Sequence, residues 1–477
     1  MKEKRRSEKN KIANRPILVL TYVFSGIFLL MIVYLAKFMV LDRNTVIANS
    51  YNKRQDKLAE TVIRGDIVSI DGEVLATTQI ASDGSEYRYY PYGNMFAHSV
   101  GFSTYGKSGL ELSSNYYLLT SNANIIERAT NSLKEEKNMG DTVVTTLDYN
   151  LQSTAYNAIG YAKGAAIVLE PDTGKILAMV SKPDFDPNNI EAVWESVTAE
   201  TEENQSILLN RATQGLYPPG STFKVLTALE YMRENGDWEQ YHYDCSGEST
   251  INSVTLHCYN NTVHGDVSLA DSIAFSCNTS FANIGTTEDM DKLHALCETF
   301  LFNKELPYSG LCNKSSFVLD SSSDRSLIPQ TVIGQGDTMI SPLHNAMIMS
   351  TIANGGVMMK PYLVDHIENY QGANVKTYSP SAYKRLMTVN EAQQMTEMLE
   401  GVIEYGTGYA LNTSAYSVAG KTGTAEYNAE GESHSWFVGF SNVENPDIVV
   451  CVVIEEADIS GVKAVNVAKQ IFDAYYQ

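Results

Sequence analysis

The chain has 477 residues and a formal net charge of −21 at pH 7. Residues 1–15 carry seven basic and two acidic side chains, a net +5, which leaves −26 on residues 16–477. A surface this acidic is unsuited to nucleic acid, so no nucleic-acid partner is expected. The chain is also longer than one hydrophobic core usually serves, and we therefore expect two domains besides any membrane segment.

The first predicted element is an apolar segment near the N-terminus. Residues 17–36 carry no charged side chain, and a helix of that length, at about 1.5 Å per residue, crosses a hydrocarbon core. We predict a cytoplasmic tail at residues 1–15, kept inside by its positive charge, and a transmembrane anchor at residues 16–41. The alternative is a cleaved signal peptide, but the apolar run exceeds the usual length and Lys37-Phe38-Met39 offers no small-residue cleavage site. All later residues are then extracytoplasmic.

Residues 42–140 are mixed in composition and rich in turn-forming residues. Arg64-Gly65-Asp66-Ile67 and Asp71-Gly72-Glu73-Val74 indicate short extended pieces around a tight turn. We predict a small external domain here.

Residues 141–477 predict a second domain of the α+β class. Extended runs at residues 165–170 and 175–181 flank Pro171-Asp172-Thr173-Gly174, a pattern typical of a β-hairpin. Three more extended runs follow at residues 416–426, 434–441 and 447–455, and the sequence between is mostly helical. Strands from both ends of a domain with a large helical insert between them indicate an α+β architecture.

Inside this domain, Ser221-Thr222-Phe223-Lys224 is the first motif whose residue types suit a catalytic role. Two prolines and a glycine at residues 218–220 stop regular structure, and a helix with one apolar face follows. Ser221 is then at the helix start, in the positive field of unpaired N–H groups, with Lys224 on the same face. A partly desolvated lysine can lose its proton and activate a serine nucleophile. The alternative is a helix cap followed by a solvated surface lysine.

Two further motifs follow in order. In Ser276-Cys277-Asn278, the hydroxyl of Ser276 can pass a proton between Lys224 and a departing amine, and the carboxamide of Asn278 can bind both ends of a peptide group. In the extended run Lys421-Thr422-Gly423-Thr424, the lysine adds positive potential, the glycine lets substrate approach the backbone, and the threonine hydroxyls can hold a carboxylate. The alternative for the second motif is that its polar residues are ordinary loop residues. The alternative for the third motif is that its glycine belongs to a β-hairpin. Because Ser-x-x-Lys recurs elsewhere, the order of the motifs carries the prediction.

Residues 209–224 resemble the active-site approach of class B penicillin-binding proteins, the monofunctional peptidoglycan D,D-transpeptidases. Segments at residues 146–152, 333–343 and 436–440 are similar to that family as well. The resemblance implies a domain like that of penicillin-binding proteins and serine β-lactamases, with a five-stranded antiparallel sheet and a helical lobe around the active site. It also implies that residues 42–140 form a non-catalytic pedestal, and it is nearest to the short penicillin-binding protein A type.

The resemblance further implies an acyl-transfer reaction. Ser221 would attack the penultimate D-alanine of a peptidoglycan stem peptide, release the terminal D-alanine, and pass the acyl group to an amine of a neighbouring strand. β-Lactams would acylate the same serine, and the N–H groups of Ser221 and Thr424 would form the oxyanion hole. No cofactor is expected. A multi-span lipid II polymerase is the expected membrane partner, contacted through residues 16–41 and the pedestal.

Several alternatives share parts of this pattern. A D,D-carboxypeptidase would use water as acceptor, and a membrane-tethered assembly factor would keep the motifs with an idle site. A serine β-lactamase would need a Glu-x-x-Leu-Asn element between the second and third motifs, which the sequence lacks. A β-lactam sensor would need a signalling domain before the span, where only residues 1–15 precede it.

The six cysteines all follow the predicted span. Cys245 with Cys258 and Cys297 with Cys312 are candidate disulfide pairs, whereas Cys451 lies in an apolar run typical of a core strand. Three histidines cluster loosely with the first two cysteines in the sequence, but their separations match no zinc template. They are His242, His257 and His264. The sequence therefore predicts no metal site.

Overall fold

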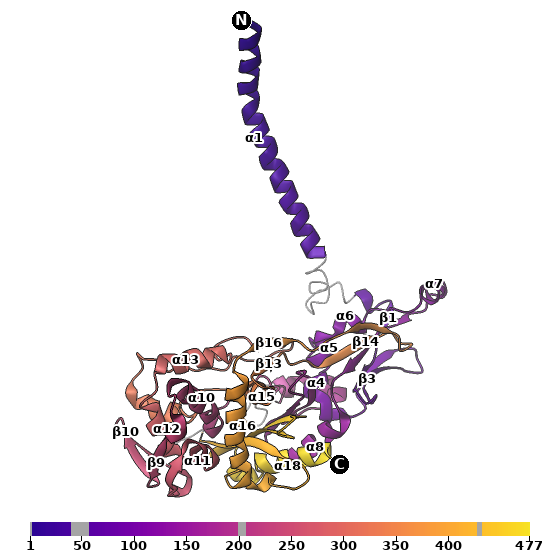
Figure 1. Ribbon diagram of the computed structural model, residues 1–477. Coiled ribbons are helices and arrows are strands. Elements are labelled where there is room, and N and C mark those ends of the chain that lie inside the picture. The colour runs from indigo at the N-terminus through magenta and orange to yellow at the C-terminus, as the bar shows by residue number, and fades with distance from the viewer. Residues whose placement is uncertain (1, 40–56, 199–206, 427–431) are drawn as a thin grey trace.

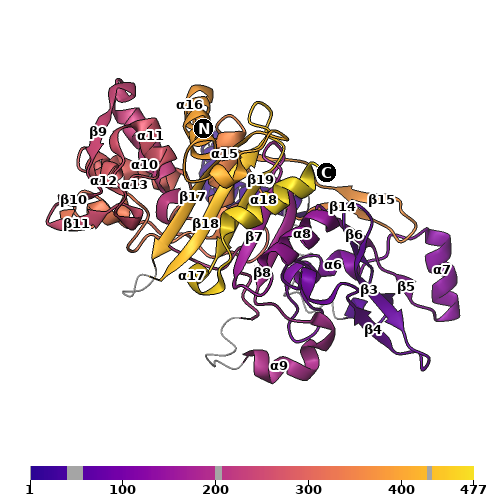
Figure 2. The same ribbon diagram turned by 90° about the horizontal axis from the view of Figure 1, so that it is seen from below.

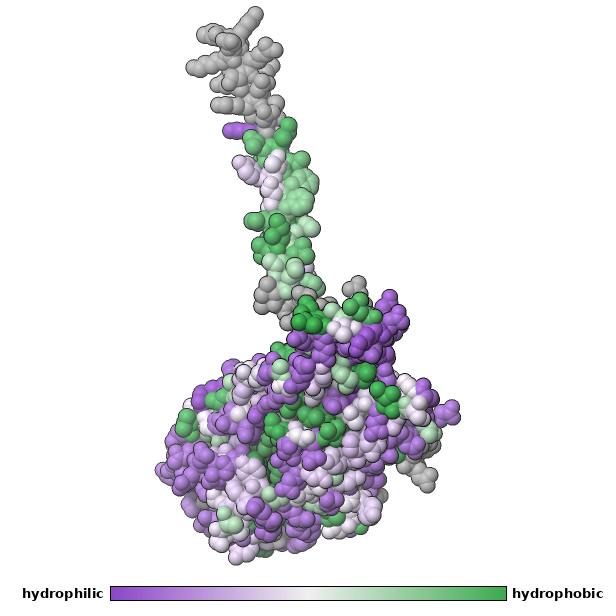
Figure 3. All heavy atoms as spheres, turned by 90° about the vertical axis from the view of Figure 1, so that its right-hand side faces the viewer, coloured by the Kyte–Doolittle hydropathy of each residue, from purple (hydrophilic) through white to green (hydrophobic). Residues whose placement is uncertain are grey.

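The computed structural model describes residues 2–39, 57–198, 207–426 and 432–477. Helix α1 (Lys2–Lys37) stands apart from the rest of the chain (Figure 1). Its part Arg15–Lys37 has a mean hydropathy of 2.5 and no buried residue, so it is long and apolar enough to span a membrane. Figure 3 shows hydrophobic side chains along the coloured part of this helix and mostly hydrophilic ones on the visible face of the globular part. A candidate span is thus confirmed at the predicted place, although residues 40 and 41 of the predicted anchor lie outside the described residues.

The part of the molecule nearest α1 is built on a six-stranded mixed sheet of order β15-β14-β6-β2-β3-β4. Its strands are β2 (Ile67–Val68), β3 (Val74–Ile80), β4 (Glu86–Tyr89), β6 (Thr142–Thr145), β14 (Val364–Glu368) and β15 (Asn374–Thr377). Around it lie β1 (Val62–Ile63), β5 (Asn138–Met139), α4 (Ala97–Val100), α5 (Gly109–Ser113), α6 (Asn115–Leu118) and α7 (Ile125–Lys134). Because β6, β14 and β15 lie beyond residue 140, the pedestal sheet is not confined to residues 42–140.

The second sheet has five strands in the order β17-β18-β19-β7-β8, and every neighbouring pair is antiparallel. The strands are β7 (Gly164–Leu169), β8 (Ile176–Lys182), β17 (Val418–Glu426), β18 (Ser433–Ser441) and β19 (Val449–Ile454). They match the five predicted runs, and the expected α+β fold is confirmed. Every residue of β7 and β19 is buried, as expected for central strands covered on both faces.

Helices cover both faces of this sheet. Helices α8 (Tyr149–Ile159) and α18 (Ala464–Tyr475) pack together on one face, and α15 (Pro342–Ala353) packs against β7, β18 and β19 from the other (Figures 1 and 2). Two short elements, α9 (Ile190–Thr198) and α17 (Ala457–Ser460), lie near one end of the sheet (Figure 2).

A helical lobe packs beside β17, at the opposite end of the molecule from β4 (Figure 2). Its helices are α10 (Lys224–Glu234), α11 (Leu269–Ala274), α12 (Asn278–Gly285), α13 (Met290–Thr299), α14 (Ile328–Thr331) and α16 (Val389–Glu404). The sequence analysis did not predict two small antiparallel ladders here, β9 (His242–Cys245) with β12 (Gly265–Ser268) and β10 (Glu248–Ile251) with β11 (Val254–His257). A third short ladder pairs β13 (Val357–Met359) with β16 (Ala382–Arg385).

Candidate active site

The turn before α10 brings Ser221 against the edge strand β17. Ser221 lies in a single 3-10 turn, Gly220–Thr222, and α10 begins at Lys224. Gly220 has a φ of +52°, and a Cβ there would stand 2.5 Å from the carbonyl oxygen of Thr424. Glycine is therefore required for the turn to reach β17. A backbone hydrogen bond also holds the turn in place, because the N–H of Gly220 donates to the carbonyl of Gly334 at 2.9 Å.

Lys224 is a fully buried lysine. Its Nζ donates to the carbonyl oxygen of Ser276 at 2.7 Å, to Oδ1 of Asn278 at 2.7 Å and to Oγ of Ser276 at 3.3 Å. Burial lowers the pKa of this amine to about 7. A substantial neutral fraction near neutral pH follows, and only a neutral amine can accept a proton.

Ser221 itself is half-buried, and its hydroxyl makes no hydrogen bond with the described part of the chain. The predicted contact between this hydroxyl and the amine of Lys224 is therefore not formed as a hydrogen bond, since the amine is turned toward Ser276 and Asn278. Catalytic hydrogen bonds are often long before substrate binds, so the arrangement is compatible with a nucleophile and its base.

The second motif forms the connection between α11 and α12. Ser276 has a φ of +57°, a left-handed conformation that non-glycine residues adopt rarely. Cys277 caps α12, with its sulfur accepting from the N–H of Ser280 at 3.4 Å. The amide of Asn278 is used at both ends, since its Nδ2 donates to the carbonyl of His257 at 2.9 Å while its Oδ1 accepts from Lys224.

The third motif lies in β17, at the edge of the five-stranded sheet. Lys421 is buried, its Nζ donates to the carbonyl of Thr422 at 3.1 Å, and burial together with the charge of Lys224 holds its pKa well below the usual value. A Cβ on Gly423 would lie 3.0 Å from Cβ of Trp436 and 3.1 Å from Cγ2 of Thr222, so a side chain there would press the strand away from the Ser221 turn. Thr424, the last residue of the motif, is exposed.

Several contacts that support these motifs were not predicted from the sequence. Nδ2 of Asn345 on α15 donates to Oγ1 of Thr222 at 3.1 Å, and the hydroxyls of Thr407 and Thr422 lie 2.6 Å apart. Nε1 of Trp436 donates to the carbonyl of Pro218 at 3.0 Å and ties β18 to the approach segment. Only Trp436 had a signal in the sequence, as part of the segment at residues 436–440; the others depend on long-range packing.

The comparisons with known proteins agree with this geometry. Residues 164–475 match the family described as penicillin binding protein transpeptidase domain, and residues 64–143 match the penicillin binding protein A dimerisation domain. The peptidoglycan D,D-transpeptidase PbpA of Mycolicibacterium smegmatis is 31% identical over 420 residues, which cover 82% of this chain and 84% of that protein.

The chain belongs to the penicillin-binding protein transpeptidase family.

Solved structures of this family share the fold. Penicillin-binding protein A from M. tuberculosis, in its imipenem acyl-enzyme complex, is 28% identical with a TM-score of 0.80, and the match covers 89% of this chain and all of that one. The D,D-transpeptidase domain of a peptidoglycan glycosyltransferase from Eggerthella lenta is 32% identical with a TM-score of 0.76, covering 86% of this chain and 97% of that one. The expected relationship to the short penicillin-binding protein A type is thus confirmed.

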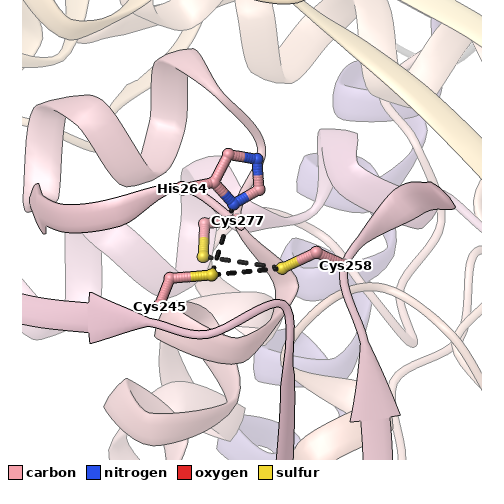
Figure 4. A group of neighbouring side chains, drawn as sticks. All are labelled: Cys245, Cys258, His264 and Cys277. Carbon is pink, nitrogen blue, oxygen red and sulfur yellow. Dashed lines mark hydrogen bonds between the residues drawn. The ribbon is translucent and has the colours of Figure 1, made fainter. Parts of the chain in front are cut away.

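The cysteines of this penicillin-binding protein are all free thiols, so neither candidate disulfide is formed. Cys451 is buried in β19, as predicted. The sequence analysis predicted no metal site from residue spacing, whereas the structure brings Cys245, Cys258, His264 and Cys277 together as a group that could hold a metal ion (Figure 4). The other two histidines face carboxylates instead, His242 that of Asp266 and His257 that of Glu248.

Proposed function

We propose that this chain is a peptidoglycan D,D-transpeptidase that works through an acyl-enzyme on Ser221. The observation that carries the proposal is the buried amine of Lys224, one turn after Ser221 and held by Ser276 and Asn278. The family membership and the β-lactam acyl-enzyme complexes of the M. tuberculosis relative support it.

In the proposed acylation, the neutral amine of Lys224 takes the proton of the Ser221 hydroxyl as Oγ attacks the carbonyl carbon of the penultimate D-alanine. The N–H groups of Ser221 and Thr424 stabilise the oxyanion, a contribution commonly worth about 3 kcal/mol per donor. When the C–N bond breaks, Ser276 relays the proton to the departing D-alanine amine. An ester on Ser221 is the intermediate.

In the proposed deacylation, an amine of a neighbouring stem peptide attacks this ester. The amine loses its proton through the Ser276 and Lys224 pair, the ester C–O bond breaks, and the Ser221 oxygen regains a proton. The new amide is the cross-link. β-Lactams enter the same first step, because their amide carbonyl is attacked by the same oxygen.

We assign substrate binding to the two other motifs. We propose that the Asn278 carboxamide, which already contacts Lys224 and the carbonyl of His257, binds the peptide group of the donor strand through its remaining N–H and lone pair. The edge strand β17 would pair with an extended peptide. Lys421 supplies positive potential behind this edge, Gly423 keeps the backbone accessible, and Thr422 and Thr424 present hydroxyls to the terminal carboxylate.

We also propose a topology and a partner. Residues 1–15 lie in the cytoplasm because of their net positive charge, residues 16–41 cross the membrane, and residues 42–477 are extracytoplasmic. Residues 42–140, together with the later strands of their sheet, form the pedestal between the membrane span and the transpeptidase domain. A multi-span lipid II polymerase of the shape, elongation, division and sporulation group would deliver nascent glycan, contacted through the span and the pedestal.

The transfer reaction separates this proposal from a D,D-carboxypeptidase. Given a stem-peptide or thioester donor and a D-amino acid acceptor, the purified full chain should form exchanged product in competition with hydrolysis, detected by mass spectrometry. The exchanged fraction should rise with acceptor concentration. Hydrolysis alone at every acceptor concentration, with strands of natural composition as donors, would favour the carboxypeptidase.

A further inference from the structure

Four side chains with no role in the proposed acyl transfer meet next to the second motif (Figure 4). Cys245 ends β9, Cys258 follows β11, His264 precedes β12, and Cys277 caps α12. One sulfur or ring nitrogen from each lies within 4.8 Å of all the others. The four ligand atoms thus come from four separate elements and converge on one point.

Three of the six distances between these four ligand atoms are close to the edges of a zinc tetrahedron, and the other three are within 4.8 Å. Sγ of Cys258 lies 3.7 Å from Sγ of Cys245 and 3.7 Å from Sγ of Cys277, and Nδ1 of His264 lies 3.4 Å from Sγ of Cys245. A tetrahedral zinc ion with Zn–S of about 2.3 Å and Zn–N of about 2.0 Å separates its ligands by about 3.8 Å for two sulfurs and about 3.5 Å for sulfur and nitrogen.

We propose that Cys245, Cys258, His264 and Cys277 bind one zinc ion as a structural Cys3His site. On binding, the three thiols release their protons to solvent, and His264 coordinates through Nδ1 with its proton on Nε2. Four protein ligands complete the tetrahedron, so the site keeps no open position for substrate or water and is structural.

The surroundings favour a metal over other uses of these thiols. A disulfide requires sulfurs about 2.05 Å apart, and joining either close pair would leave the third buried cysteine unpaired. The three cysteines are at most 2% exposed, which protects thiolate ligands from water. Oγ1 of Thr279 donates to Sγ of Cys245 at 3.2 Å, the kind of outer hydrogen bond that orients a ligating sulfur.

The local fold gives a reason for such a site. Residues 242–268 form two separate two-stranded ladders of four residues per strand, and most of their side chains are exposed or half-buried. Two-stranded ladders of this size are marginal in water by themselves. A single ion would join both ladders to α12 and supplement the small hydrophobic cluster there, in which Val267 is buried and Tyr243 and Phe275 are half-buried.

The site is also coupled to the second motif through covalent bonds. Cys277 is the residue between Ser276 and Asn278, and the carbonyl that holds the Asn278 amide belongs to His257, the residue before Cys258. Metal binding therefore fixes both sides of the contact that positions Asn278 against Lys224. We infer that the ion positions the Ser276 and Asn278 side chains without touching substrate.

Metal content tests the site directly. The full chain, purified in detergent without chelators and then dialysed, should retain about one zinc ion per molecule, measured by elemental mass spectrometry. Substitutions His264→Ala and Cys258→Ser should each lower zinc content severalfold or more, and His264→Cys should retain it because a four-thiolate site also suits zinc. Matched controls are His242→Ala and Cys312→Ser, which should keep the wild-type content.

Two further readouts do not depend on enzyme activity. Cobalt(II) bound in place of zinc should give the visible absorption of a tetrahedral thiolate site, lost in His264→Ala. Intact mass without reductant should show all cysteines reduced. A zinc-free wild-type chain whose mass is lower by two hydrogen atoms would overturn the proposal in favour of a disulfide, and so would zinc content that is equal in wild type and in the ligand variants.

The positioning role is tested by acylation. Removing zinc with a strong chelator should slow labelling by a fluorescent penicillin by about tenfold or more, the scale on which support around metal sites acts, and adding zinc but not magnesium should restore it. Unchanged labelling after complete zinc removal would overturn the positioning role. Absence of labelling in zinc-loaded protein would instead contradict the proposed transpeptidase function, so the two failures are distinguishable.

Discussion

At the residue scale, Lys224 shows how burial sets chemistry. Its amine has no exposed surface and donates to one carbonyl and two neutral side-chain oxygens. Burial disfavours the charged amine, and none of these three acceptors is a carboxylate that would restore the usual pKa. The neutral amine that the proposed mechanism needs is therefore a consequence of where the fold places this residue.

If Lys224 is the base, the substitution Lys224→Arg should lower the rate constant of penicillin acylation by about two to four orders of magnitude, because a guanidinium keeps its proton. Stopped-flow or gel-based labelling measures this, and thermal unfolding checks that the variant folds. Lys421→Ala serves as comparison and should weaken binding of the carboxylate while Ser221 stays partly reactive. Acylation of Lys224→Arg at a near wild-type rate would assign the lysine a purely structural role.

The same amine predicts the pH dependence of acylation. The base is active when it is neutral, so the acylation rate constant should rise with pH and level off above the pKa of about 7. Labelling rates across a pH series, with folding monitored in parallel, measure the profile. A rate constant that falls as pH rises through 7, or that does not change between about pH 5 and pH 9, would contradict a lysine base.

The three motifs could be located in the sequence because each is short and local, whereas the contacts that support them could not be predicted. Asn345 contacts Thr222 from more than a hundred residues later in the chain, and Thr407, which contacts Thr422, lies in the loop after α16. The four proposed zinc ligands could not be grouped from the sequence for a related reason. Metal templates rely on close pairs in the sequence, whereas Cys245, Cys258 and Cys277 come from the ends of separate elements and become neighbours only when those elements pack.

At the element scale, a buried cluster of charged side chains joins Arg64, just before β2, and Arg88 on β4 to Glu111 on α5. Oε2 of Glu111 accepts from Nε of Arg64 and its Oε1 from Nε of Arg88, each at 2.6 Å, and the Glu111 side chain has no exposed surface. Arg64 leads into β2, and Arg88 is on β4. The cluster therefore holds a small domain together through charge where its strands are short.

Removing the carboxylate of Glu111 should lower the free energy of unfolding of the pedestal. Glu111→Ala leaves two buried guanidinium groups without their partner, a change that commonly costs about 3–5 kcal/mol. The matched control is Glu86→Ala in the same domain, whose partly exposed pair with Lys137 should contribute less than about 1 kcal/mol. Unfolding of the full chain in denaturant, followed by a probe in the pedestal, should separate the two variants. An equal loss of unfolding free energy in Glu111→Ala and Glu86→Ala would show that the buried cluster does not stabilise the pedestal more than a partly exposed ion pair does.

Two of the strands that the sequence predicted, β7 and β19, are continuous apolar runs. β7 and β19 are buried along their whole length, and such runs bounded by turn residues identify core strands. β10 and β11 alternate between exposed and half-buried residues, and with four residues each they are too short for that alternation to identify a strand. The pedestal boundary was also beyond sequence reasoning, because β14 and β15 return to the first sheet from more than two hundred residues later.

At the scale of the whole molecule, the part Arg15–Lys37 of α1 is long and apolar enough to span a membrane. Replacing residues 16–41 with an unrelated span of equal length should preserve penicillin labelling and reduce co-purification with a lipid II polymerase, because association between membrane helices depends on specific packing. The unmodified chain at the same expression level is the control. Full association of the swapped chain would remove the span from the proposed contact surface.

Deletion of residues 42–140 is a poorer test of the same contact. It would remove β2, β3 and β4 from a sheet that also contains β6 and β14, and would expose the edge of β6. Loss of association could then reflect misfolding. Charge-reversing changes at exposed pedestal residues, such as Arg128→Glu on α7, probe that surface without opening the sheet.

The central claim is that Ser221 is the acylated nucleophile. The full chain incubated with a fluorescent penicillin should carry one covalent adduct, and peptide mapping by mass spectrometry should place it on Ser221. Ser221→Ala should fold with an unchanged unfolding temperature and take no label. An adduct on any other residue, or labelling that survives Ser221→Ala, would contradict the account.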